Sequence, residues 1–141
     1  MPGPTPIRIR EIDHVVLRTH DMQRLLTFYR DVLGCAIERT QPEIGLTQLR
    51  AGRSLIDLID LSLPRNRSLK TDPAPGGARN MDHYCVRVEP FDAAAIVAHL
   101  REHGCEPGAV ASRYGAEGAG PSIYVDDPDG NTVELKGPPV S

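Results

Sequence analysis

The chain has 141 residues, of which 40% are hydrophobic and 25% are charged, and its net charge is −3. This composition is that of one globular domain and excludes a disordered chain. The negative charge, two Phe, four Tyr and no Trp also argue against nucleic-acid binding. No apolar run approaches the roughly 20 residues of a membrane span, and the first residues do not resemble a signal peptide. We therefore expect a cytoplasmic protein that binds a small molecule and has no membrane partner.

A strand at residues 12–19 is the first clear element, and its core sequence occurs twice. DHVVLR at residues 13–18 returns as DHYCVR at residues 82–87. Side chains alternate between the two faces of a strand, so the His and the Arg of each copy share one face and the apolar residues share the other. One face can then close a core while the other lines a polar cavity. The chain is therefore predicted to contain two copies of one unit.

The first unit continues with a helix and three strands. Asp21 is a suitable N-cap, and Gly34 is the expected residue just past the helix end. The apolar residues between them follow helical spacing: Leu25, Phe28, Tyr29, Val32 and Leu33. Short strands are predicted at residues 35–40, 47–51 and 54–61, separated by turn residues. The unit is thus βαβββ.

The segment from Pro64 to Asn80 shows no periodicity and contains several Pro and Gly residues. It is long for a connection inside a compact domain. It also carries four basic residues against one acid, Asp72. One interpretation is a solvated linker between the units. The other is a basic lid that recruits an anionic substrate, because Arg matches the geometry of carboxylate and phosphate groups.

The second unit repeats the pattern with a strand at 81–88, a helix at about 91–103, and strands near 107–113, 122–126 and 132–136. The last two strands are joined by a DPDG turn at residues 127–130. The predicted fold class is α+β, with two tandem βαβββ modules whose mixed sheets curl around a shared cavity. Residues 1–141 form one domain: module one at about 12–63, a connecting segment at 64–80, and module two at about 81–136.

Four ionisable residues occupy matching places in the two modules. His14 and His83 are on the first strands, and Asp57 and Glu134 are on the last strands. Each acid stands between two aliphatic residues, so its side chain points away from the core. Two imidazoles and two carboxylates suit one divalent cation such as Ni, Zn, Co, Mn or Fe. The alternating run LIDLIDL leaves the facing of Asp57 open.

The paired His strands, the helix end FYRDVLG at 28–34 and the run DPDGNTVEL at 127–135 resemble the vicinal oxygen chelate superfamily. Its members include glyoxalase I, methylmalonyl-CoA epimerase, fosfomycin-resistance transferases and extradiol dioxygenases. The resemblance extends from Ile12 to Lys136. By motif, it places metal ligands at His14, His83 and Glu134, with a fourth ligand at Asp57 where Glu is more usual. It also implies a homodimer, in which the cavity forms within one chain or between two.

The resemblance implies a reaction class. The favoured one is a metal-dependent lyase or isomerase of glyoxalase type, which acts on a small 2-oxo or 2-hydroxy compound through a metal-bound enediolate. Glu134 is the first choice for the general base and Asp57 the second. Alternatives are an Fe(II) extradiol-type dioxygenase and a non-catalytic small-molecule binding protein of the antibiotic-resistance type.

Three further residues are candidates for substrate binding. Arg18 and Arg87 lie on the predicted cavity side of their strands, where each can hold a substrate carboxylate or form an exposed salt bridge. Tyr124 can donate a proton to a developing oxyanion or pack within its hairpin. Cys85 is interpreted as a small buried hydrophobic residue.

Overall fold

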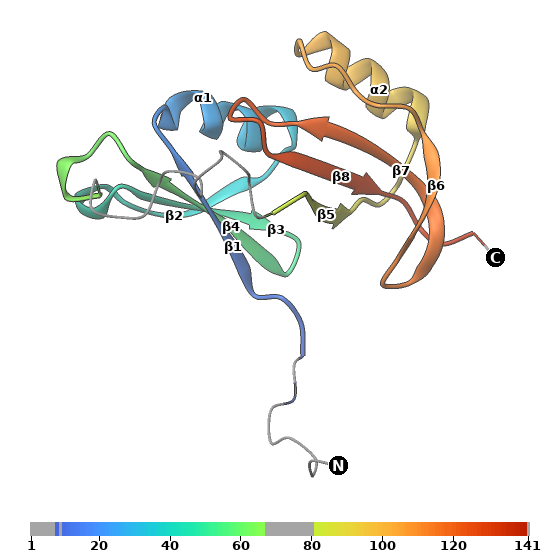
Figure 1. The fold of residues 1–141 in the computed structure, drawn as a ribbon, viewed down its shortest axis with the longest axis horizontal. Coiled ribbons are helices and arrows are strands. Elements are labelled where there is room, and N and C mark those ends of the chain that lie inside the picture. The colour runs from blue at the N-terminus through green and yellow to red at the C-terminus, as the bar shows by residue number, and fades with distance from the viewer. Residues whose placement is uncertain (1–7, 9, 67–80, 141) are drawn as a thin grey trace.

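The computed structural model describes residues 8, 10–66 and 81–140 of the chain. The protein contains two four-stranded mixed sheets, with strand orders β1-β4-β3-β2 and β5-β8-β7-β6 (Figure 1). Each sheet has one parallel pair, β1 with β4 or β5 with β8, and its other pairs are antiparallel. The α+β class and the tandem βαβββ arrangement are therefore confirmed.

The elements of the first module are β1 (His14–Thr19), α1 (Met22–Thr27), the π-helical turn η1 (Phe28–Val32), β2 (Ala36–Gln41), the 3-10 turn η2 (Pro42–Ile44), β3 (Leu46–Ala51), β4 (Ser54–Asp60) and the 3-10 turn η3 (Pro64–Asn66). Those of the second are β5 (Tyr84–Arg87), α2 (Ala93–Glu102), β6 (Ala111–Gly115), β7 (Gly118–Asp126) and β8 (Thr132–Lys136).

Both helices begin at an aspartate cap. Asp21 accepts a hydrogen bond from the backbone N–H of Arg24, and Asp92 accepts one from that of Ala95, each at 3.1 Å. These bonds satisfy backbone donors that the first helical turn leaves without partners. Gly34 follows the first helical segment with a φ of 81°, which favours glycine at the end of a helix.

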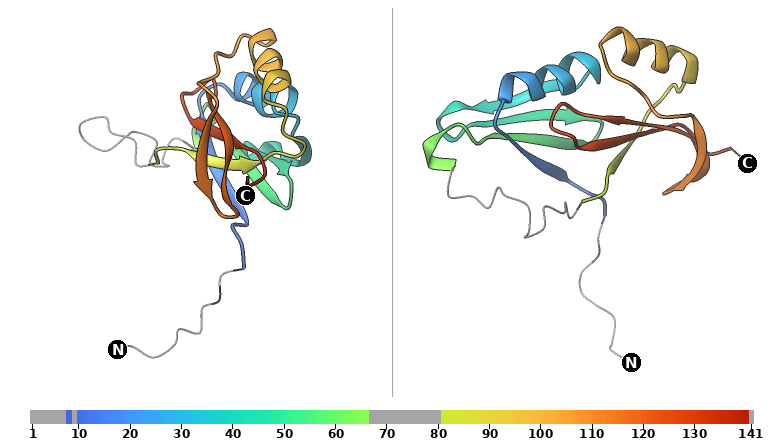
Figure 2. Two further views of the ribbon diagram at one scale, coloured as in Figure 1. Left: turned by 90° about the vertical axis from the view of Figure 1, so that its right-hand side faces the viewer. Right: turned by 45° about the horizontal axis from the view of Figure 1, so that its top comes forward.

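The two sheets lie side by side, and both helices lie on one side of them (Figure 2). Apolar residues of the strands and of the helices form one common core: Leu17, Leu25, Phe28, Tyr29, Leu49, Ile56, Leu58, Leu100, Ile123, Val125, Val133 and Leu135. Burial of these side chains supplies the main favourable free energy of folding. The opposite face of each sheet is left for polar residues.

A buried hydrogen-bond chain joins the two modules. The Tyr84 hydroxyl donates to the Tyr29 hydroxyl at 2.7 Å, and the Tyr29 hydroxyl donates to Asp127 Oδ2 at 2.7 Å. Tyr29 belongs to the first module, whereas the other two residues belong to the second. Burial, together with the neighbouring groups, raises the pKa of Tyr29 far above its ordinary value. Burial also raises the pKa of Tyr84 above its ordinary value. Both tyrosines therefore stay protonated, and their hydrogen bonds link the two modules.

Some predicted boundaries were wrong. The strand expected near residues 107–113 is β6 at Ala111–Gly115, so it begins later than predicted. The Gly108 N–H donates one hydrogen bond to the Tyr124 carbonyl, but regular pairing with β7 begins only at Ala111. Part of the proposed basic lid, residues 67–80, lies outside the described residues. Within the described part of the chain, no helix is long and apolar enough to cross a membrane.

Candidate functional site

The sheet faces that point away from the helices carry the predicted ligands. On the first sheet, His14 lies on β1, and Asp57 lies beside it on β4, where Asp57 is paired with Val16. Residues two apart share a strand face, so His14 and Asp57 are on the same face. The hydrogen bond with Asp13 raises the pKa of His14, burial opposes this, and the charge of Asp57 raises the pKa further.

Asp57 is buried, with 5% of its surface exposed. Its Oδ2 accepts a hydrogen bond from Gln48 Nε2 at 3.2 Å. Its Oδ1 is also buried, and among the described residues it has no hydrogen-bond partner. A buried carboxylate oxygen without a partner costs free energy unless a cation or donor neutralises it. Asp57 is therefore built to accept a further ligand.

The second sheet carries the other pair. Glu134 Oε1 lies 3.2 Å from His83 Nε2, and Glu134 is only 6% exposed. Glu134 pairs with Cys85 on β5 and with Tyr124 on β7. His83, which directly precedes β5, and Glu134 thus meet on the face that lies opposite the helices.

Each predicted ligand imidazole is held by the aspartate that precedes it. His14 Nδ1 lies 2.7 Å from Asp13 Oδ2, and His83 Nδ1 lies 2.6 Å from Asp82 Oδ2. This contact favours a proton on Nδ1 and leaves the Nε2 lone pair available to a metal ion.

Tyr124 stands beside His83 on the same face of the second sheet. The two rings meet edge to face with centroids 5.2 Å apart. The guanidinium carbon of Arg113 lies 4.3 Å from the Tyr124 ring centroid, and Arg113 Nη1 donates to the Ser122 hydroxyl at 2.8 Å. A basic group and a phenol therefore flank the His83–Glu134 pair.

The two arginines predicted to bind substrate, Arg18 and Arg87, have different surroundings. Arg18 is exposed. Arg87 donates to Glu117 at 2.8 Å and to Glu89 at 3.2 Å, so carboxylates of the chain already occupy its guanidinium. Cys85 is exposed, so its interpretation as a buried residue was wrong. Partial desolvation of its thiol, followed by the charge of Glu134, raises the pKa of Cys85 to about 11. Its thiol is thus protonated at neutral pH and is a poor nucleophile.

The structure brings the four predicted ligands together as two pairs. His83 contacts Glu134, and His14 is within the electrostatic influence of Asp57, but the pairs lie on separate sheets that stand side by side (Figures 1 and 2). Within residues 8, 10–66 and 81–140, no three His, Cys, Asp or Glu side chains are close enough to hold one metal ion. His14 and His83 nevertheless line one large open cavity of about 1240 Å³.

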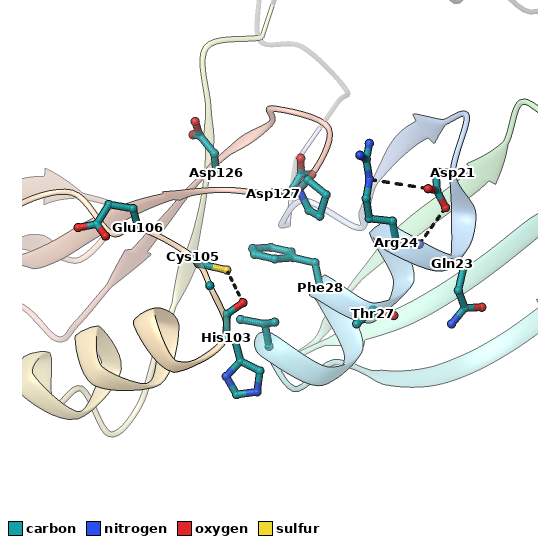
Figure 3. Close-up of a pocket in the computed structure, with 13 residues that line it drawn as sticks. Asp21, Gln23, Arg24, Thr27, Phe28, His103, Cys105, Glu106, Asp126 and Asp127 are labelled. Carbon is teal, nitrogen blue, oxygen red and sulfur yellow. Dashed lines mark hydrogen bonds and ion pairs between the residues drawn. The ribbon is translucent and has the colours of Figure 1, made fainter.

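A second pocket lies on the helix side, between the end of the first helical segment and the turn after α2 (Figure 3). Phe28 and Cys105 contribute to its walls, and Arg24 stands at its edge. Asp127 also lines it, but this carboxylate accepts hydrogen bonds from Tyr29 and Asn131. The pocket therefore belongs to the contact between the modules, and we assign it no chemistry.

Three polar residues of the site were not identified from the sequence: Gln48, Arg113 and Lys136. Gln48 is on β3 and Arg113 is on β6, so only the pairing of these strands with their neighbours brings the two residues to the site. Lys136 is on β8, two positions after Glu134. The repeated Asp-His dipeptide did mark both histidines, but not the role of its aspartate.

Comparisons with a family model and with known proteins agree on one protein family. The sequence model of the Glyoxalase/Bleomycin resistance protein/Dioxygenase superfamily matches residues 11–135. The glyoxalase domain-containing protein RDO1 of Mycosarcoma maydis is 30% identical over 137 residues, which cover 92% of this chain and 69% of RDO1.

Solved structures share the fold. The crystal structure of virulence protein STM3117 from Salmonella typhimurium aligns with a TM-score of 0.74 and 24% identity, over 94% of this chain and 99% of that one. Lactoylglutathione lyase from Agrobacterium tumefaciens aligns with a TM-score of 0.62 and 25% identity, over 94% of this chain and 96% of that one.

Proposed function

Because the chain belongs to the Glyoxalase/Bleomycin resistance protein/Dioxygenase superfamily, we propose that it is a metal-dependent lyase or isomerase of glyoxalase type. Its substrate is a small 2-oxo or 2-hydroxy compound, which loses a proton from the carbon next to a carbonyl group. One observation carries this proposal. Each sheet presents a His with an Asp on its Nδ1 and a buried carboxylate on the neighbouring strand.

The residues fit a divalent cation. Two imidazole nitrogens and two carboxylates form a donor set that first-row metals accept, and His14, His83, Glu134 and Asp57 supply it. The buried Asp57 Oδ1, which has no hydrogen-bond partner in residues 8, 10–66 and 81–140, supports the same assignment, since a cation would satisfy it. When bound, the ion would polarise the oxygens of the substrate and stabilise negative charge on them.

The roles of the side chains follow from their positions. Glu134 is the proposed general base, because it is buried beside His83 and faces the open side of the sheet. Tyr124 stands next to His83 and can donate a hydrogen bond to an oxygen that becomes negative. Asp13 and Asp82 keep the imidazole rings in place.

The site is completed by a second copy of the chain. Members of the superfamily bind small molecules and often form dimers. Among the described residues of this chain the His14–Asp57 pair and the His83–Glu134 pair are on separate sheets and do not meet, and a partner protomer is the proposed source of the second pair. Val16, on the same face as His14, leaves 47% of its surface exposed and supplies apolar area for such a contact.

Metal reconstitution tests the reaction. The apoprotein is given Ni, Zn, Co, Mn or Fe(II) separately and then assayed with a hemithioacetal and with a catechol. We expect at least one metal to support hemithioacetal turnover without oxygen uptake. Glu134→Gln should lower that turnover by about 10²- to 10⁴-fold, since proton abstraction is lost. The exposed carboxylate of Glu102 on α2 provides a matched control, Glu102→Gln, which should retain full activity.

Two results would overturn the assignment. Oxygen uptake with Fe(II) and a catechol alone would make the protein a ring-opening dioxygenase. Absence of turnover with every metal, together with ligand binding that chelators do not affect, would make it a small-molecule binding protein.

A further inference from the structure

Lys136 is an unusual residue in this chain. Only two of the 16 basic residues are lysines, Lys70 and Lys136. Lys136 is the last residue of β8, two positions after Glu134, so both side chains are on the face opposite the helices. It is nevertheless buried, with only 5% of its surface exposed. A lysine is rarely buried to this extent unless its ammonium group is paired.

No such pair is formed within the described part of the chain. Arg87 pairs with Glu117 at 2.8 Å, whereas the Lys136 ammonium has no hydrogen bond or ion pair with any described residue. Arg113 contacts no carboxylate of the described residues either, because its bonds go to the carbonyl and hydroxyl of Ser122. Among the residues that the structure describes, two positive groups on this face therefore have no acid as a partner.

Neighbouring glycines leave room for the lysine side chain. A Cβ atom on Gly115 would lie 2.9 Å from Lys136 Cε, whereas one on Gly120 would first meet the Pro138 carbonyl and would lie 3.3 Å from Lys136 Nζ. Gly115 is on β6 and Gly120 is on β7, so the side chain of Lys136 reaches across β7 toward β6. The absence of a side chain at Gly115 thus leaves room for the aliphatic part of Lys136, and Lys136 Nζ is not among the fully buried atoms that lack a partner.

We propose that Lys136 and Arg113 bind an oxyanion, and that the substrate carries a carboxylate or phosphoryl group a few bonds from its reacting carbon. The reacting end lies at His83 and Glu134, an assignment that rests on the proposed function. The oxyanion pocket itself requires no metal. An anionic group would supply the partner that both cations lack, and Tyr124, stacked under Arg113, would separate this pocket from His83.

The two lysines allow a direct test in the full-length protein. Lysine labelled with ¹³C at Cε gives two side-chain NMR signals, and Lys70→Arg assigns them. The chelator-treated protein is titrated with pyruvate and, separately, with methylphosphonate, at an ionic strength held constant with NaCl. We expect the Lys136 signal to shift to saturation with one of these probes. The probe that saturates identifies the carboxylate or the phosphoryl class.

Lys136→Met tests the energetics. We expect the affinity for the saturating probe to fall by roughly 10- to 100-fold, because a charge-assisted hydrogen bond is lost. The melting temperature of the ligand-free variant should rise, because a largely shielded positive charge that has no acid among the described residues is removed. Arg101→Met is the matched control, since it removes an exposed charge from α2 and should leave probe affinity unchanged.

The outcomes separate this inference from the proposed function. An unmoved Lys136 signal with both probes, or a Lys136→Met variant that melts earlier and binds the probe normally, would overturn the oxyanion pocket. Zinc titration of the same samples reports on the metal site independently. A protein that binds no zinc yet shows the Lys136 shift would overturn the proposed function and retain the pocket.

Discussion

At the scale of single residues, the aspartates that precede His14 and His83 decide which imidazole nitrogen is available. Their carboxylates lie within 2.7 Å of Nδ1 in both copies, so a metal would be bound through Nε2. Such a partner orients the ring and increases its basicity. Two copies of the same contact, 69 residues apart in the sequence, indicate that it serves the site in both modules.

We predict that Asp82→Asn weakens zinc binding by about 10- to 100-fold without changing the fold, because the imidazole loses its oriented carboxylate partner. Competition with a zinc chelator measures the affinity, and circular dichroism checks the fold. Glu102→Gln again serves as the control. Wild-type zinc affinity in Asp82→Asn would show that the contact has no part in metal binding.

Asp57 shows what the sequence could not settle for a single residue. The run LIDLIDL alternates in a way that fits two facings, and no local signal chooses between them. Parallel pairing of β4 with β1 places Asp57 opposite Val16, on the face of His14. This pairing joins residues about 40 positions apart in the sequence, and the periodicity within one strand cannot predict it.

At the scale of the elements, repetition and spacing predicted most of the fold. The strand expected at residues 132–136 has the same bounds in the structure, and both helices were predicted with their caps or apolar stripes. The π-helical turn at Phe28–Val32 was not predicted, because the apolar spacing of a helix does not distinguish one type of turn from another. β6 begins later than predicted because regular pairing with β7 starts at Ala111.

The helix that carries Tyr29 is attached to the second module by hydrogen bonds as well as by apolar contacts. Tyr29 accepts a bond from Tyr84 and donates one to Asp127, and all three residues are shielded from water to a large extent. Asn131 also donates to Asp127 at 2.8 Å. A polar contact remote from the two half-sites therefore links the modules that carry them.

We predict that Tyr29→Phe lowers the free energy of unfolding by about 1–3 kcal/mol, because the Tyr84 hydroxyl loses its acceptor and Asp127 loses a donor. Urea denaturation measures the change. Tyr114→Phe is the control, since Tyr114 is 85% exposed and should give a change near zero. Equal stability of the two variants would refute the proposed role of the hydrogen-bond chain.

At the scale of the whole molecule, each sheet carries half of the proposed ligand set. The sequence predicted the four residues and the two modules, but it left open whether the cavity forms within one chain or between two. That choice depends on how the sheets are oriented, which the side-by-side arrangement in Figure 2 describes. A symmetric dimer would bring the first sheet of each protomer against the second sheet of its partner, so that two equivalent sites form.

Subunit complementation tests this central claim most directly. His14→Ala and His83→Ala each damage both sites of their own homodimer, so neither variant alone should bind zinc at the site. In a heterodimer of the two, one site contains both substitutions and the other contains none. After random exchange of subunits, we predict recovery of about one quarter of the wild-type zinc content, since half of the dimers are mixed and each has one intact site. A mixture of folded, exchanged subunits that recovers no zinc, or a strict monomer that binds zinc fully, would contradict a site shared between two chains.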